Sequence, residues 1–287
     1  MPINDICMDQ SSLWRVCLRE HTRFLDSLRQ NIYRPYVDGF KVTGLSPDKV
    51  PTLPELNQSI ASTGWELVFV PGFIPSRTFF EYQARKQLPL ARNLRSLEDA
   101  AYSPQPDMFH DLLGHVPQVF CPIVSELCVA IGRSALEFPE TRNEREQYAA
   151  ELELSTLLAH GCTDQFKLQR AEQRVDECKR RTAAAPDPFD LLIRFYLWTI
   201  EFGVVRASDG PQVVGAGLLS SRDECIRVIS GGTPLRRFDE SAFQHAINFS
   251  GYQDQLFVLE ELGQAFELLQ RLLDSTATRR SSNLIAA

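Results

Sequence analysis

A chain of 287 residues with 44% hydrophobic and 23% charged residues is long enough for one large globular domain with a substantial core. Its formal net charge of −7 excludes the basic surface that proteins use to bind nucleic acids or anionic membranes. No apolar run has the length of a membrane span, and the first residues lack the apolar segment of an export signal. We therefore expect a cytoplasmic protein that binds neither nucleic acid nor membranes.

The cysteines agree with this compartment. There are seven, an odd number, and no two of them form a CxxC pair. This pattern is typical of reduced thiols in a cytosolic protein and argues against a disulfide framework or a structural zinc site. We expect the cysteines to serve in packing.

The first part of the chain combines helical spacing with one strand-like segment. Proline and glycine mark the boundaries between these segments. The predicted elements are a helix over 11–34, a loop over 44–60 that leads into a short helix near Pro54, a strand over 65–74, and a helix over 76–87 that opens at Ser76.

The second part is rich in helix-forming residues. The expected elements are two helices over 141–185 separated at Gly161 (the second mostly polar and exposed), a strongly apolar helix over 189–205, a glycine-punctuated loop or strand over 213–221, a segment 252–273 that closes with an amphipathic helix, and a frayed tail over 276–287. The sequence therefore predicts a mostly helical fold with a small β component.

Two of the five histidines fall in one stretch, "PDMFHDLLGHVP", over residues 106–117. Gly114 and Pro117 predict that the helix in this stretch stops at or just after Leu113. On an ideal helix, residues five apart are rotated by roughly 140° and share no face. His110 and His115 can therefore converge only if the backbone turns between them, and Gly114 permits a turn. The alternative is that both are hydrogen-bonded residues at a helix end.

Glu201 lies in "FYLWTIEFGVV" and has no charged neighbour within four residues on either side. A buried carboxylate costs several kcal/mol unless it is paired or bound to a metal. The alternative to a metal-bound Glu201 is a salt bridge from Glu201 to Arg194 or Arg206. Two histidines and one carboxylate form the facial triad of non-haem Fe(II) oxygenases. The same ligands could hold catalytic zinc, and the spacing does not decide between the two metals.

The motifs "PDMFHDLLGHVP", "LWTIEFG" and "GAGLLSS", in this order, resemble those of the aromatic amino acid hydroxylases, which use Fe(II) and a tetrahydropterin. The likeness is strongest to the short bacterial phenylalanine hydroxylases. Residues 36–80 follow the bacterial pattern almost throughout, and "YQDQLFVLEEL" resembles the closing strand and helix of the family. The resemblance covers about Trp14 to Phe266, with one interruption.

The resemblance implies one catalytic domain over residues 1–287, with iron in a cleft. Its core would span about 14–273, with a helical insertion over about 141–185 and a flexible tail over about 276–287. The implied activity is a monooxygenase reaction, with O₂ as co-substrate and tetrahydrobiopterin or a related pterin as cofactor. The partner would be a small aromatic amino acid, and the protein a monomer or small homo-oligomer.

The resemblance also assigns the site residues. The catalytic iron ligands would be His110, His115 and Glu201. Arg95 would bind the carboxylate of the amino acid. The other substrate contacts would be Ser103, Leu197, Trp198, Gly215, Gly217 and Ser220. The pterin would contact Gly72, Ile74, Ser76, Phe79, Asp111 and Tyr196.

The sequence departs from the family in two respects. First, 201 − 115 = 86 residues separate His115 from Glu201, about double the usual spacing, and segment 141–185 accounts for the surplus. Such an insertion could be a lid, a dimerisation arm or a partner surface.

Second, the metal ligands are intact while the presumed substrate pocket is changed. Leu197 replaces a tryptophan and leaves Trp198 as the neighbouring aromatic. Asn93 replaces an aromatic residue, Gln105 a glutamate and Ser103 a threonine. Phenylalanine is therefore the default substrate, with tyrosine, tryptophan, a related precursor or an unusual ring position as alternatives.

Two other functions use the same residues. A metal-dependent hydrolase would need a general base, for which Asp111 is the only obvious candidate. A non-catalytic protein would keep the metal for stability and use the insertion to bind partners. A requirement for reduced pterin separates the hydroxylase from the first, and turnover separates it from the second.

Overall fold

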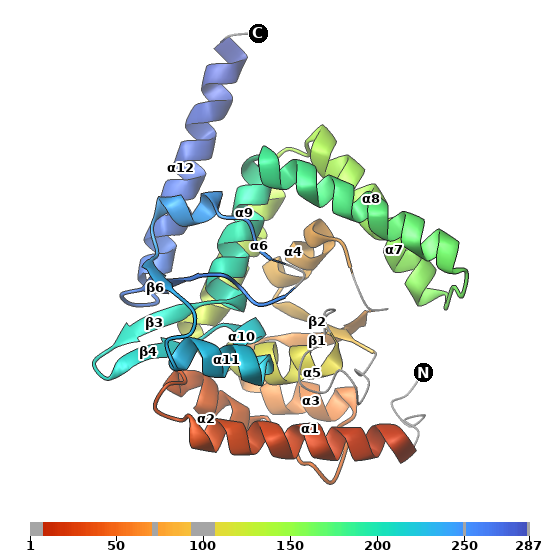
Figure 1. Cartoon of the computed structure of the whole chain (residues 1–287), viewed down its shortest axis with the longest axis vertical. Helices are drawn as coiled ribbons and strands as arrows, with labels where there is room; N and C mark the ends of the chain where they lie inside the picture. Colours follow the sequence, from red (N-terminus) through yellow and green to blue (C-terminus); the bar gives the residue numbers. More distant parts are fainter. Residues whose placement is uncertain (1–7, 71–73, 93–106, 249–250, 286–287) are drawn as a thin grey trace.

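The computed structural model describes residues 8–70, 74–92, 107–248 and 251–285 (Figure 1). The predicted fold class, mostly α with a small β component, is confirmed. The elements of the first part are α1 (Met8–Ser27), α2 (Arg34–Val42), α3 (Leu53–Ile60), η2 (Ala61–Thr63), β1 (Glu66–Val70), α4 (Ser76–Ala84), β2 (Gln87–Ala91), α5 (Met108–His110), η3 (Asp111–His115), η4 (Val116–Phe120) and α6 (Pro122–Glu137).

The second part begins with a helical hairpin and ends with a long helix that carries the C-terminus away from the body (Figure 1). Its elements are α7 (Arg142–Ala159), α8 (Gln165–Ala184), α9 (Pro188–Tyr196), η5 (Leu197–Glu201), β3 (Val204–Ala207), β4 (Gly210–Val213), α10 (Ala216–Ser220), α11 (Arg222–Ile229), β5 (Leu235–Arg237), η6 (Glu240–Gln244), β6 (Leu256–Leu259) and α12 (Gln264–Ile285).

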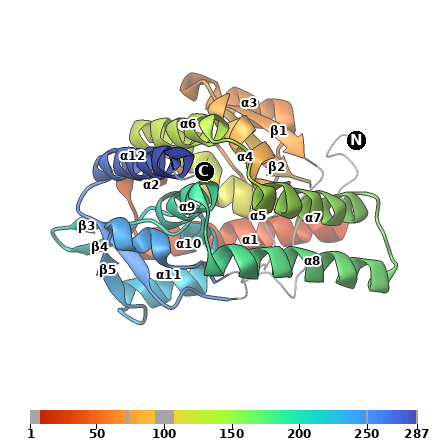
Figure 2. The ribbon, with the colours of Figure 1, turned by 90° about the horizontal axis from the view of Figure 1, so that it is seen from above.

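The described strands form two small sheets. β1 and β2 pair in parallel, and β4, β3, β6 and β5 form a four-stranded sheet in that order. Within this sheet β3 is antiparallel to β4 and parallel to β6. Viewed from above, the four-stranded sheet and the α7–α8 hairpin lie on opposite sides of α9 (Figure 2).

The core surrounds the helices that carry the two predicted ligand motifs. Trp14 of α1 is fully buried and stacks on Phe109 of α5, with 5.4 Å between the ring centroids. Phe195 of α9 is fully buried too, and its ring packs against Phe238 and Phe243. Because both helices are fixed by large buried aromatic side chains, the residues at their ends have defined positions.

The predicted hairpin over 141–185 is present, with Gly161 in the left-handed conformation between its two helices (φ 63°). Asp164 caps α8 by accepting hydrogen bonds from the backbone N–H groups of Phe166 and Lys167. Only Ala171 and Val175 of α8 are buried, as the polar composition predicted. A buried ion pair between Arg77 of α4 and Glu144 of α7 ties the hairpin to the body.

Arg194 of α9 ties the other end of the hairpin to the body. Its buried guanidinium donates hydrogen bonds to the carbonyl oxygens of Thr182 and Ala183, at the end of α8. It also donates to the carbonyl oxygens of Phe243 and Gln244. One planar donor group therefore satisfies four backbone acceptors from two distant segments.

Several predicted elements differ in the structure. The helix expected over 189–205 ends at Glu201 and is followed by β3, and the loop or strand expected over 213–221 contains the short helix α10. The helix expected over 11–34 stops at Ser27, because the backbone of Asn31 and Tyr33 hydrogen-bonds instead to Val213. The amphipathic pattern of residues 11–34 is a local signal and could not predict this long-range pairing. At the other end of the chain, α12 continues as a helix to Ile285, through most of the segment expected to fray.

The six cysteines in the described part of the chain are all free thiols. Among the described residues, no single helix is long and apolar enough to cross a membrane, although one sharply bent pair, Met108–Gln118 with Pro122–Glu137, meets the criteria of length and composition.

Replacing Arg194 with Met should lower the free energy of unfolding by about 3 kcal/mol, because four backbone carbonyl groups lose the buried guanidinium that donates to them. Urea unfolding followed by circular dichroism measures this change. The control is Arg206→Met. Arg206 pairs with Glu260 and its side chain is 63% exposed, so the expected change is within about 0.5 kcal/mol. Equal effects of both variants would contradict the role assigned to Arg194.

Candidate active site

The two histidines of "PDMFHDLLGHVP" are brought together by a wide helical turn. The helix does not stop at Leu113, as the sequence predicted, but continues through η3 as a π-helix. In this turn the N–H of Val116 bonds to the carbonyl of Asp111, five residues back. A π-turn places residues five apart above one another, which an α-helix does not. His110 and His115 therefore reach the same side without a break in the helix.

Gly114 has a different role from the one predicted. It keeps helical backbone geometry and has no positive φ. A Cβ atom at this position would lie 2.8 Å from the carbonyl oxygen of Ala216 in α10. Glycine is therefore needed for the close approach of α10 and not for a turn.

A π-turn also sets the position of Glu201. It ends η5, a π-turn that continues α9, and the N–H of Phe202 bonds to the carbonyl of Leu197 five residues back. The backbone packs tightly behind it: a Cβ at Gly215 would lie 2.2 Å from the Glu201 carbonyl oxygen, and one at Gly217 would lie 3.4 Å from Oε2 of Glu201. These two glycines let α10 sit directly against the carboxylate.

The three predicted ligands converge. His115 Nε2 lies 2.9 Å from Oε1 of Glu201 and 3.1 Å from His110 Nε2, and His110 Nε2 lies 3.6 Å from Oε2 of Glu201. Two ligand atoms that bind one metal ion at about 2.1 Å lie about 3 to 3.5 Å apart. Within the described ranges, this is the group of His, Cys, Asp and Glu residues whose donor atoms are placed to hold a metal. The donor set and its spacing fit one ion.

The alternative for Glu201, a salt bridge to Arg194 or Arg206, is wrong. Arg194 donates to backbone carbonyls, and Arg206 pairs with Glu260 at 2.8 Å. Burial by itself would raise the pKa of Glu201, but the charge of His115 and a hydrogen bond from it, together with the charge of His110, lower the pKa to about 2. Glu201 is therefore ionised because the two histidines lie beside it.

Two further side chains orient the histidines. Oγ of Ser220 lies 2.9 Å from His110 Nδ1, and Oε1 of Gln118 lies 3.3 Å from His115 Nδ1. The Gln118 amide also donates to the carbonyl oxygens of Ile200 and Val214, so it joins three segments of the site. Such outer partners fix the tautomer and the ring orientation of metal-binding histidines.

Ser220 was predicted to contact the substrate. In the structure its hydroxyl contacts the ring of His110, one of the candidate metal ligands. Gln118 was missed. Its signal in the sequence was its position three residues after His115, a spacing that puts two side chains on one helical face.

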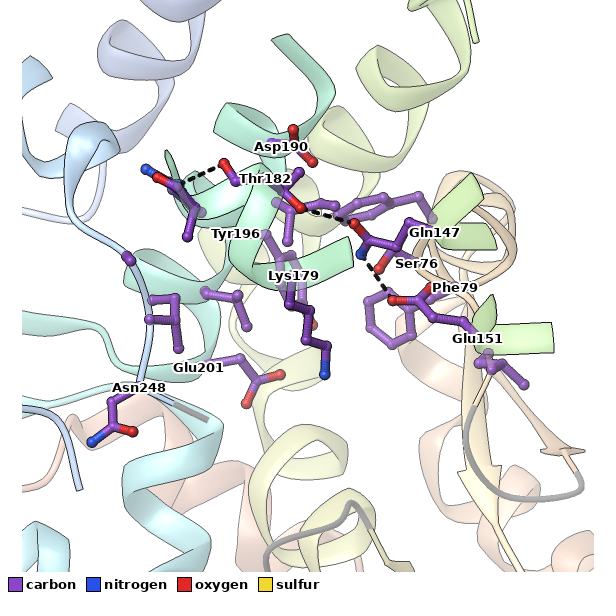
Figure 3. A pocket seen from close by; sticks show the side chains of 18 of the residues that line it. Ser76, Phe79, Gln147, Glu151, Lys179, Thr182, Asp190, Tyr196, Glu201 and Asn248 are labelled. Carbon is purple, nitrogen blue, oxygen red and sulfur yellow. Dashed lines mark hydrogen bonds between the residues drawn. The ribbon is translucent and has the colours of Figure 1, made fainter. Parts of the chain in front are cut away.

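A cavity of about 720 Å³ opens from the three ligands (Figure 3). Its walls carry both apolar and polar side chains. Six residues that were predicted to bind substrate or cofactor line it: Ile74, Ser76, Phe79, Asp111, Tyr196 and Leu197. Arg95, Ser103 and Gly72, and the substituted positions Asn93 and Gln105, lie outside the described residues.

Two polar groups in this lining are buried beside the ligands. The Tyr196 hydroxyl is buried beside Glu201, and burial together with the charge of Glu201 raises its pKa well above the usual value, so it stays protonated. Asp111 accepts a hydrogen bond from the N–H of Ala91, and burial raises its pKa to about 7.

Trp198 does not line the cavity, contrary to the prediction. It is 2% exposed, its Nε1 donates to the carbonyl of His245, and its ring packs on Phe257 at 5.0 Å between centroids. Adjacent helical residues point roughly 100° apart. Because Leu197 faces the cavity, the Trp198 indole is directed into the core.

The sequence also missed the contribution of the hairpin to the cavity. Gln147 and Glu151 of α7 line it, and the Gln147 amide donates to Glu151 at 2.9 Å (Figure 3). Glu151 is 3% exposed, and burial raises its pKa. No motif marked these residues, because "AAELEL" reads as an ordinary helix and only the tertiary position of α7 makes them part of the site.

Replacing Glu201 or His110 with Ala should weaken Fe(II) binding by more than about 100-fold, because the loss of a ligand costs more than the loss of an orienting partner. Anaerobic titration calorimetry measures this affinity. The matched control is His160→Ala, since this exposed histidine directly follows α7 and its ring hydrogen-bonds to the carbonyl of Thr156 in that helix. Stoichiometric, wild-type binding by the Glu201 variant would refute the ligand assignment.

Comparison with known proteins finds that this chain is similar to bacterial phenylalanine hydroxylases. A phenylalanine-4-hydroxylase of Ralstonia nicotianae is 26% identical over 235 residues, which cover 81% of this chain and 61% of that protein. A phenylalanine-4-hydroxylase of Pseudomonas aeruginosa is 29% identical over 251 residues, covering 87% of this chain and 78% of the relative. The chain thus spans less than two thirds of the length of the Ralstonia protein.

The fold matches that of Chromobacterium violaceum phenylalanine hydroxylase with bound iron(III) and 7,8-dihydrobiopterin. The TM-score is 0.72 at 23% identity, and the match covers 100% of this chain and 85% of the other. The model of the biopterin-dependent aromatic amino acid hydroxylases matches residues 2–154 and 181–281, and leaves out 155–180, which lie in the hairpin. Since the family pattern covers most of the sequence and both motif blocks, the chain belongs to the biopterin-dependent aromatic amino acid hydroxylase family.

Proposed function

We propose that this protein is an iron- and tetrahydropterin-dependent monooxygenase that hydroxylates the ring of an aromatic amino acid, with phenylalanine as the default substrate. The observation that carries this proposal is the convergence of His110, His115 and Glu201 at one end of a cavity, in a chain of this family. The relatives named above are phenylalanine-4-hydroxylases.

The three ligands would hold Fe(II) on one side and leave the opposite positions open to the cavity. When bound, Fe(II) and the reduced pterin supply the activation of O₂. The chain contributes orientation. Ser220 and Gln118 fix the two imidazole rings, and the close packing of Gly215 and Gly217 fixes the carboxylate.

The pterin would lie against Ile74, Ser76 and Phe79, with Tyr196 and Asp111 nearby, and Gly72 would complete this surface. The Phe79 ring meets Tyr196 edge-on at 5.3 Å between centroids, so the aromatic surface is preorganised. The protonated Tyr196 hydroxyl lies beside Glu201, at the edge of this surface. These features fit a flat heterocycle with polar edges.

The amino acid would occupy the part of the cavity beside Leu197. By similarity to the family, Arg95 would bind the carboxylate of the amino acid, and Ser103 would contribute to the pocket. Leu197 is smaller than the tryptophan it replaces and lines the cavity, so the ring of the substrate has more room here. This favours a substrate or ring position that differs from ordinary para-hydroxylation of phenylalanine.

We also propose a cytoplasmic location and a monomer or small homo-oligomer without nucleic acid or membrane partners. The free state of the six described cysteines and the acidic net charge support these points. A hydrolase that uses Asp111 as base is disfavoured by the family and by the Ala91 N–H, which already occupies Oδ2 of Asp111.

Anaerobic loading with Fe(II), followed by air, a reduced pterin and a panel of aromatic amino acids, tests the reaction. We expect a product heavier by one oxygen that requires both iron and pterin, with its regiochemistry read against ortho-, meta- and para-hydroxylated standards. Stoichiometric iron with no product from any amino acid would contradict the proposal and favour the non-catalytic alternative.

Replacing Leu197 with Trp should change the ratio of kcat/KM between phenylalanine and tryptophan by about tenfold or more, because a larger side chain fills the space beside the ring. Competition assays with both amino acids measure the ratio. Ile123→Val, an exposed conservative change on α6, is the control. An unaltered ratio in the Leu197 variant would place substrate selection elsewhere.

A further inference from the structure

Part of the cavity lining comes from α8, which contributes Gln173, Asp176, Lys179 and Arg180. All four lie within residues 155–180, which the family model does not match. None of the four side chains is apolar, and together they carry both signs of charge. The cavity of this chain is therefore bordered by polar groups that the family pattern does not supply.

This part of the lining adjoins the surface on which the pterin is proposed to lie. The Glu151 carboxylate of α7 accepts a hydrogen bond from the backbone of Ser76, at the start of α4. The Gln147 amide donates to Glu151 at 2.9 Å, and the Thr182 hydroxyl at the end of α8 lies 3.3 Å from the amide oxygen of Gln147 (Figure 3). Because these contacts run without a gap from Ser76 to Thr182, α8 is held beside the pterin surface.

The arrangement of the cavity leaves one direction for a substituent of the pterin ring. In the proposed function the ring lies on Phe79, and the amino acid lies beside Leu197. Figure 3 places Glu201 at one end of the cavity and Thr182 at the other, with Phe79 and Tyr196 between them. Since the iron ligands and the amino acid border the ring on two sides, its substituent extends toward α7 and α8.

The side chains that border this space include both donors and acceptors. Lys179 is half-buried and extends into the cavity, and its ammonium group can only donate (Figure 3). Asp190 of α9 and the amide of Gln147 bring oxygen acceptors to the same lining. A hydroxyl group both donates and accepts, so it can bond to either kind of neighbour. An apolar substituent would cover these polar groups without bonding to them, which is unfavourable.

We propose that Lys179 binds the hydroxyl-bearing substituent of the pterin, so that α8 selects pterins with a hydroxyalkyl group over those with a short alkyl group. This inference rests on the proposed function. The amino acid keeps its place beside Leu197, and its carboxylate keeps Arg95 as its partner. Lys179 therefore contributes to the choice of the cofactor and not to the choice of the substrate.

Anaerobic titration calorimetry of the Fe(II)-loaded protein with 7,8-dihydrobiopterin and with 6-methyl-7,8-dihydropterin tests the proposal. The two ligands share the ring, and only the first carries hydroxyl groups on its substituent. For Lys179→Met we expect the Kd of 7,8-dihydrobiopterin to rise by about tenfold, because one charge-assisted hydrogen bond is lost. The Kd of the methyl compound should stay as in wild type. Lys179→Arg, which keeps a charged donor, should restore most of the affinity for 7,8-dihydrobiopterin.

Lys167→Met is the matched control. Lys167 lies on the same helix with its side chain 67% exposed, pairs with Asp164 and does not line the cavity. It should leave both Kd values unchanged. An equal rise for the two pterins in Lys179→Met would place Lys179 against the ring and overturn the proposal, and so would the absence of any rise.

Hydroxylation assays with the corresponding tetrahydropterins separate this proposal from the proposed function. Lys179→Met should raise the KM for tetrahydrobiopterin and leave the KM for the amino acid unchanged. A wild type that binds 7,8-dihydrobiopterin through Lys179 without hydroxylating any amino acid would refute the function and support the role of Lys179. Hydroxylation with no dependence of either pterin constant on Lys179 would do the reverse. Absence of pterin binding to wild type would overturn both.

Discussion

Glu201 places a carboxylate in a segment that carries no other charge for four residues on either side, and the rest of the site is arranged around this carboxylate. Desolvation would raise the pKa of this carboxyl group, but the two histidines lower it to about 2. A buried anion of this kind is stable only with cations beside it. The two π-turns, the close approach of α10 and the contacts of Ser220 and Gln118 with the histidines all bring His110 and His115 to that one carboxylate.

The α7–α8 hairpin adds a second layer to this arrangement. Its ties to α4 and α9 run through buried polar groups, namely the Arg77–Glu144 ion pair and the guanidinium of Arg194. Buried polar bonds of this kind fix a geometry, because a shift of either partner leaves a desolvated group without its hydrogen bond. The hairpin thereby adds charged side chains to a cavity that aromatic side chains of α4 and α9 also line.

Several features of the site follow from particular residues of the sequence. The isolation of Glu201 in an apolar run indicates a cation, and the five-residue spacing of the histidines indicates unusual backbone geometry. The nature of that geometry was predicted wrongly: Gly114 reads as a turn residue, whereas the helix widens into a π-turn and Gly114 makes room for Ala216. Trp198 was predicted to enter the pocket, and the helical rotation between neighbours sends it to the core.

The sequence by itself determined the helical class, the hairpin around Gly161 and the choice of His110, His115 and Glu201 as the candidate metal ligands, because periodicity, breakers and an isolated charge are local signals. Only the tertiary structure decided that Ser220 and Gln118 orient the ligands, that β2 pairs with β1, and that α8 turns Lys179 toward the cavity. Each of these depends on contacts between segments far apart in the chain. A hydrogen bond or cavity wall formed across such a distance leaves no period or motif in either segment alone, so it appears only when the elements pack.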